Sequence, residues 1–107
     1  MNKKVQVLLK KNNDILISDY FLANIDNDII TYSDPLNNIF DIHSLKLERV
    51  DDEKNLVFDF SNQVLMCKYN GNSFSVKIDV ICTDISFNRV YIKYRLESDV
   101  FEYIINL

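Results

Sequence analysis

The chain of 107 residues contains only one glycine, one proline, one histidine and two cysteines, and it has no tryptophan. A single glycine excludes a Gly-rich phosphate-binding loop, which needs several glycines. Any histidine-based catalytic site would have to form around His43, and the adjacent Ser44 points to the opposite face of a strand. The sequence therefore predicts no catalytic residues, no metal site and no cofactor, and we expect a protein that is not an enzyme.

The two cysteines, Cys67 and Cys82, are too few for a disulfide framework. They form no Cys-x-x-Cys pair, and one histidine does not complete a zinc site. A disulfide between them requires the segments 62–69 and 74–83 to pair as a hairpin. The simpler interpretation is two free, partly buried thiols that act as small apolar side chains.

An excess of basic residues is also missing, since the formal net charge is −4. A nucleic-acid-binding domain normally carries a basic surface, so we expect no nucleic-acid partner. Residues 14–59 hold eleven acids against three bases. The densest acidic groups, residues 26–28 and 51–53, fall in predicted turns and do not follow the order of a calcium loop. We interpret them as solvated turn residues.

No apolar stretch is long enough to span a membrane, and the one that follows Met1 is too short for a secretory signal. The chain is 48% hydrophobic and 26% charged, as is typical of a folded soluble domain. At this length we expect one domain over residues 1–107. We expect it to lie in the cytoplasm and to make no contact with a membrane.

Alternation of apolar and polar residues runs through almost the whole chain. Phe74, Val76, Ile78, Val80 and Cys82 share one parity, which is the period of a half-buried strand. Further strands are predicted at residues 3–10, 15–23, 29–33, 39–50, 56–60, 63–69, 85–87 and 90–97. The Asn-Gly pair at residues 70–71 predicts a type I′ hairpin turn between two of them.

Two segments break this regularity. In residues 39–50 the apolar parity changes after Ile42, and we predict a β-bulge near His43 and Ser44 that shifts the phase. In residues 98–107 the pattern fits a strand through Phe101, Tyr103, Ile105 and Leu107. It fits equally a short helix that starts at Ser98 or Asp99, and both remain open.

The predicted strands follow one another through tight turns, which favours an antiparallel meander. Such a sheet has to close or fold onto itself to bury its apolar face and hide its edges. We therefore predict an all-β fold, a small antiparallel meander of about eight strands that closes into a barrel. The alternative is a two-sheet β-sandwich with a short C-terminal helix.

The order of these elements resembles the YwiB-like family of small uncharacterised bacterial proteins, which have a lipocalin-like, calycin-type β-barrel. The resemblance covers nearly the whole chain and depends on five segments: Ile30-Thr31-Tyr32-Ser33, Leu45-Lys46-Leu47-Glu48-Arg49, Leu56-Val57-Phe58, Tyr69 to Phe74, and residues 90–105. The family's hairpin resembles Thr-Pro-Tyr-Gly, whereas this chain has Tyr69-Asn70-Gly71-Asn72. The resemblance implies a barrel whose last element is a strand, and it implies no activity.

Arg49 and His43 are the candidate ligand-binding residues. Arg49 follows Leu45 and Leu47 on the apolar parity, and an inward-facing arginine needs a partner, which a carboxylate or phosphate of a ligand would supply. His43 shares this phase only if the bulge falls before it. The simpler interpretation of Arg49, which we favour at this point, is that the strand ends there and the side chain reaches water.

We expect a non-enzymatic binding module that holds a small, mostly apolar or anionic ligand in the barrel. This hypothesis follows from fold analogy. The alternative is a protein interaction or homodimerisation module whose barrel is filled by its own side chains. Apolar residues of both parities near Val100 and Ile104 favour the alternative.

Overall fold

The computed structural model describes residues 1–107 and contains ten strands and no helix. The strands are β1 (Asn2–Lys11), β2 (Asp14–Asp26), β3 (Ile29–Ser33), β4 (Asn37–Asp41), β5 (Lys46–Val50), β6 (Lys54–Asp59), β7 (Val64–Tyr69), β8 (Asn72–Ser86), β9 (Arg89–Leu96) and β10 (Asp99–Asn106). Each strand pairs with its sequence neighbours in antiparallel orientation, and β1 pairs with β10 to close a barrel.

The predicted all-β barrel is therefore confirmed, although the expected strand count of about eight is slightly low. The C-terminal segment is strand β10, so the sandwich with a C-terminal helix is wrong. No helix of the structure has the length and apolar character needed to cross a membrane.

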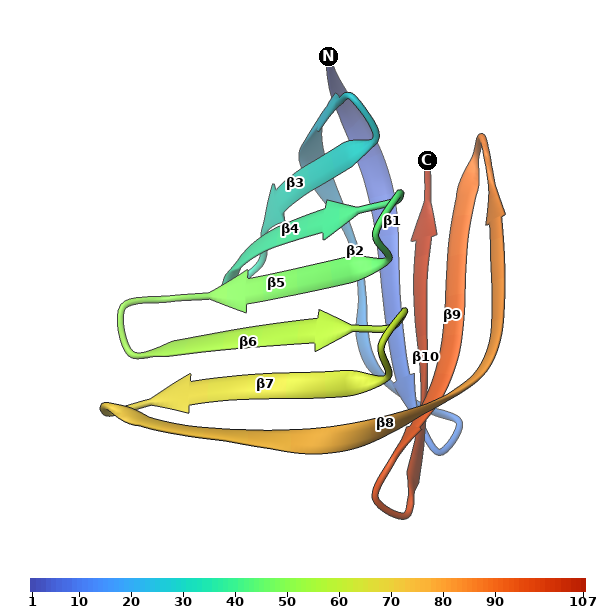
Figure 1. Cartoon of the computed structure of the whole chain (residues 1–107). Helices are drawn as coiled ribbons and strands as arrows, with labels where there is room; N and C mark the ends of the chain where they lie inside the picture. Colours follow the sequence, from blue (N-terminus) through green and yellow to red (C-terminus); the bar gives the residue numbers. More distant parts are fainter.

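Two strands take part in both halves of the barrel. β8 pairs with β7 through its first residues, up to Lys77, and with β9 from Ile78 onward. β2 pairs with β1 over Asp14–Asn24 but with β3 only over Asn24–Asp26. Figure 1 shows the result: β1, β9 and β10 stand upright, and β3 to β7 lie across them. Bent strands at the corners are typical of orthogonally packed sheets.

Pairs of residues in the left-handed region form several of the hairpin turns. Asn70 (φ 50°) and Gly71 (φ 76°) connect β7 to β8, as the Asn-Gly signal predicts. Asn12 (φ 51°) and Asn13 (φ 72°) connect β1 to β2 in the same way. Two positive φ values are the requirement of a type I′ turn, whose twist matches that of the flanking strands.

The bulge predicted near His43 and Ser44 is wrong. β4 ends at Asp41, a turn follows, and β5 begins at Lys46. The Asp41 carboxylate accepts a hydrogen bond from the backbone N–H of His43 at 2.9 Å, and Leu45 adopts a φ of 53°. A full turn between two strands explains the change of apolar parity without a bulge.

A bulge does occur in β8, between Val80 and Cys82. The predicted strands 74–83 and 85–87 form this one long strand. Beyond the bulge the residues of the other parity point inward, so Cys82 is exposed. Cys67, on the neighbouring strand β7, is buried. Both thiols are free, so no disulfide links them.

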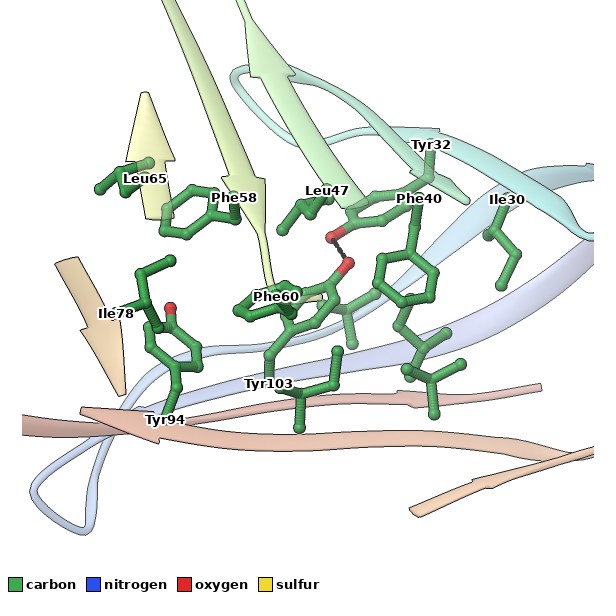
Figure 2. Close-up of a cluster of buried hydrophobic side chains, with 14 of the residues drawn as sticks. Ile30, Tyr32, Phe40, Leu47, Phe58, Phe60, Leu65, Ile78, Tyr94 and Tyr103 are labelled. Atoms are coloured by element: carbon green, nitrogen blue, oxygen red, sulfur yellow. Dashed lines mark hydrogen bonds between the residues drawn. The ribbon is translucent and has the colours of Figure 1, made fainter. Parts of the chain in front are cut away.

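Large apolar side chains fill most of the barrel interior (Figure 2). Near its centre the hydroxyls of Tyr32 and Tyr103 form a hydrogen bond of 2.8 Å. Two groups of side chains pack on either side of this pair: Ile30 and Phe40 on one, and Phe58, Phe60, Leu65, Ile78 and Tyr94 on the other. The interior is thus a packed core, and space remains only where these side chains do not reach.

Candidate functional site

A cavity of about 130 Å³ lies at one end of the barrel interior. Ten of its twelve lining residues are hydrophobic. All twelve lining residues come from seven strands and the loop after β3: Val7, Leu9, Ile17, Tyr32, Asp34, Leu47, Arg49, Phe58, Tyr94, Leu96, Phe101 and Tyr103. The cavity is therefore an apolar chamber with one charged pair, Asp34 and Arg49, in its wall.

Strand alternation places the apolar lining. Leu9 shares its inward parity with Val5 and Val7, which are 1% and 0% exposed. Phe101 on β10 pairs with Tyr94 on β9, and the two rings stack with centroids 5.3 Å apart and an angle of 13°. This stacked aromatic pair forms part of the apolar wall.

Arg49 lies inside the barrel and is held by two partners. Its Nη2 donates to Asp34 Oδ2 at 2.9 Å, and its Nε donates to Asn38 Oδ1 at 2.8 Å. The side chains of Arg49 and Asp34 are 18% and 3% exposed. The interpretation that Arg49 ends its strand and reaches water is therefore wrong, and the inward-facing arginine has a carboxylate partner from its own chain.

This arrangement leaves Arg49, one of the lining residues, with unpaired donors. A guanidinium carries five N–H groups, of which Arg49 uses two in these bonds. Tyr94 also lines the cavity, and no hydrogen bond to its hydroxyl contributes to its pKa. Burial raises the pKa of Tyr94, although the charge of Arg49 lowers it in part. Burial likewise raises the pKa of Tyr32 to about 12. The tyrosines therefore stay neutral, and the cavity offers hydrogen bonds without net charge.

The structure does not bring His43 and Arg49 together. His43 lies in the turn before β5, whereas Arg49 lies near the other end of that strand. The His43 side chain is 81% exposed, and its Nε2 lies 3.0 Å from Asp28 Oδ2. Whether His43 binds a ligand stays an open prediction, but it takes no part in this cavity.

In the acidic turn at residues 51–53, a side-chain carboxylate accepts hydrogen bonds from the backbone of the turn itself. Asp51 Oδ1 accepts hydrogen bonds from the N–H groups of Glu53 and Lys54 at 2.8 and 2.9 Å. These bonds lower the pKa of Asp51 below its ordinary value. No group of three or more His, Cys, Asp or Glu side chains in the structure is placed to hold a metal ion.

Sequence reasoning missed two polar residues of the cavity wall, Asp34 and Tyr94, and it missed Asn38, which holds Arg49 from outside the lining. Asp34 lies in the loop after β3, just before Pro35, and Asn38 lies in β4. The β4–β5 register places Asn38 directly opposite Arg49. The available signal was the arginine itself, because a buried arginine requires a carboxylate. It did not identify which one, since Asp34, Asp41, Glu48 and Asp51 all lie in or beside that hairpin.

We compared the chain with known proteins. No protein-family model, no curated protein and no solved structure matches it. The features of the chain that bear on its function are therefore the cavity and its residues.

Proposed function

We propose that this chain is a non-enzymatic binding module that holds a small, neutral, mostly apolar ligand in the cavity beside Arg49. The observation that carries the proposal is an apolar chamber with unused hydrogen-bond donors on Arg49 and Tyr94. A few polar groups in an otherwise apolar pocket are the usual design of a small-molecule site.

The volume of about 130 Å³ limits the size of the ligand. An apolar cavity of about 150 Å³ in another protein binds benzene. A single ring with one polar substituent therefore fits this cavity, whereas a fatty acid or a nucleotide does not. The proposed ligand is a ring-sized molecule, or the ring-sized part of a larger one that extends out of the cavity.

The charges in the cavity wall favour a neutral ligand over the anionic ligand that the sequence suggested. Asp34 already supplies the carboxylate that Arg49 needs, and its side chain is 3% exposed. A ligand anion would add a second negative charge to a desolvated pair, which is costly. A hydroxyl or carbonyl group can accept a hydrogen bond from Arg49 or Tyr94 without that cost.

Other parts of the proposal come from the sequence. The resemblance to the YwiB-like family supports a calycin-type barrel and a bacterial source, and calycin-like barrels are suited to holding one small ligand. We further infer a cytoplasmic protein without cofactor, metal or nucleic-acid partner. These points support the binding function, and each is open to direct measurement.

A fragment titration tests the binding function. Phenol, benzene and benzoate are added separately to ¹⁵N-labelled protein, and amide shifts are followed by two-dimensional NMR. We expect phenol to shift the amides of Leu9, Leu47 and Phe101, with a Kd on the order of 1 mM for so few atoms. Benzoate should bind at least fivefold more weakly than phenol.

Two variants locate the binding. Leu9→Phe adds a ring to the cavity wall and should abolish the phenol shifts. Phe87→Ala removes a side chain that is 95% exposed on the β8–β9 turn, and it should leave the phenol Kd unchanged. Absence of shifts with all three fragments would contradict the binding function. Tighter binding of benzoate would contradict the neutral ligand.

A further inference from the structure

The inner face of the sheet continues beyond the cavity. Across β5, β6, β7 and β8, four residues stand directly opposite one another in turn: Arg49, Leu56, Cys67 and Phe74. Directly opposite residues point to the same face of an antiparallel sheet. Because Arg49 lines the cavity, the other three residues extend the face on which the cavity is built.

This extension is open to solvent at its far end. Cys67 is 7% exposed, whereas Phe74 is 58% exposed although it points to the same face. Tyr69, two positions after Cys67 on β7, also shares this face and is 49% exposed. In Figure 1 the end of β7 and the start of β8 lie to the left of the upright strands β1, β9 and β10. The upright strands thus leave this end of the inner face uncovered.

We call Leu56, Cys67, Tyr69 and Phe74 together the shelf. Leu56 is partly buried and packs against the hydrophobic core. Burial raises the pKa of the Cys67 thiol, which keeps this group uncharged. The shelf is therefore a largely apolar surface with two exposed aromatic rings. An apolar patch of this kind beside a pocket is typical of a ligand-binding groove.

Arg49 lies at the junction of the cavity and the shelf. Two of its five N–H groups donate to Asp34 and Asn38, and its cross-strand neighbour on the next strand is Leu56. An acceptor atom bound to Arg49 would have apolar surface on two sides, in the cavity and on the shelf. The row from Arg49 to Phe74 crosses three spacings between strands, about 14 Å in total.

We propose that the cavity binds one end of an elongated, neutral ligand whose aliphatic tail lies on the shelf. A carbonyl or hydroxyl oxygen between the two parts accepts a hydrogen bond from Arg49. The inference rests on the proposed binding function and adds the shape of the ligand. The cavity of about 130 Å³ holds only a ring-sized end, and Tyr69 and Phe74 offer the remainder an apolar surface. Covering that surface with the tail removes apolar area from water.

Three aryl ketones test this arrangement, because they share one ring and one carbonyl and differ only in the tail. Acetophenone, butyrophenone and hexanophenone are titrated separately into ¹⁵N-labelled protein. Acetophenone should bind with a Kd on the order of 1 mM. A methylene on an open surface buries about half its area, so hexanophenone should bind roughly tenfold more tightly than acetophenone. Only the longer ketones should shift the amides of Tyr69 and Phe74.

Two variants of the β7–β8 hairpin locate the tail. Phe74→Ser removes the far end of the shelf, and it should reduce the tenfold gain to less than about threefold without changing the Kd of acetophenone. Met66→Ser is the matched control, because Met66 is 41% exposed and points to the opposite face of β7 from Cys67. It should leave all three Kd values unchanged. Circular dichroism establishes that both variants are folded.

The outcomes separate this inference from the binding function. Equal Kd values for the three ketones would overturn the elongated ligand and leave the binding function in place. A gain with tail length that is the same in Phe74→Ser as in the wild type would do the same. Absence of binding by all three ketones would overturn the binding function, and the inference with it.

Discussion

At the scale of single residues, the ion pair of Arg49 and Asp34 is the feature on which the polar part of the cavity depends. Replacing Arg49 with Met keeps an unbranched apolar stem but removes the guanidinium, which leaves the buried carboxylate of Asp34 without its cation. Loss of one partner of a buried pair costs about 3–5 kcal/mol of the free energy of unfolding. Urea denaturation of the Arg49→Met variant measures this loss.

Lys77→Met is the control for that measurement. Lys77 pairs with Asp79 at 3.5 Å, but both side chains are largely exposed, so its removal should cost less than about 1 kcal/mol. Equal losses in the two variants would show that Arg49 is not structurally paired in solution.

Asp59 gives the clearest prediction for pH. Burial alone would raise its pKa, but hydrogen bonds from Asn62 and Ser61 and the charge of Lys46 together lower it below 3.8. The carboxylate therefore stabilises the fold fully above the unfolded pKa of about 3.9, and this contribution is lost as the pH falls through the lower folded value. In the Asp59→Asn variant, the free energy of unfolding should therefore decrease less steeply below pH 4 than in the wild type. An equally steep decrease in the variant would show that other acids cause the pH dependence.

The sequence placed Arg49 on the apolar parity, but the interpretation favoured there had the side chain reach water, and its partner was not predicted. Asp34 lies fifteen positions earlier, in a turn that also suits a solvated aspartate. Only the antiparallel register of β4 and β5 places the turn beside Arg49, and alternation within one strand does not reveal which strand it faces. Contacts between distant residues are thus the part of the site that a pattern in one segment cannot supply.

At the scale of elements, the turn between β7 and β8 depends on the one glycine. Gly71 has a φ of 76°, and a Cβ atom added there would meet no other atom within 4 Å. Gly71→Ala should therefore cost about 1–2 kcal/mol, entirely from backbone strain. Gly71→Asn should cost less, because asparagine tolerates this region. Thermal unfolding compares the two, and equal stability of the Ala variant and the wild type would contradict the left-handed turn.

Turns whose residues strongly favour positive φ could be predicted from the sequence, and turns without such residues could not. Asn70 and Gly71 identify their hairpin because few residues adopt positive φ. The turn from β4 to β5 contains Ile42 and Leu45, which resemble strand residues, so the change of parity was attributed to a bulge. The bulge in β8 leaves no compositional signal near Val80, and only the register with β9 reveals it.

At the scale of the whole molecule, the barrel could be predicted and its cavity could not. A run of alternating segments has to close or fold onto itself, whatever their exact number, and the short turns favoured closure. The cavity is the volume that remains after large side chains such as Phe58, Phe60 and Tyr94 have packed, and their packing follows from ring orientation in three dimensions. A sequence pattern gives the inward residues without giving the space between them.

Ligand binding should be visible as stability of the whole barrel. A ligand that binds only the folded state at ten times its Kd raises the free energy of unfolding by about 1.4 kcal/mol. We expect this increase for phenol with the wild type and none with Leu9→Phe. An equal increase in both proteins would place phenol outside the cavity.

The most direct test of the account is a set of intermolecular nuclear Overhauser effects between phenol and the methyl groups of the wild-type protein. The cavity predicts contacts from the phenol ring to the methyls of Leu9, Ile17 and Leu47, which line it from three different strands. Contacts confined to Leu16 and Leu22 on the outer surface, or none at all, would contradict binding inside the barrel.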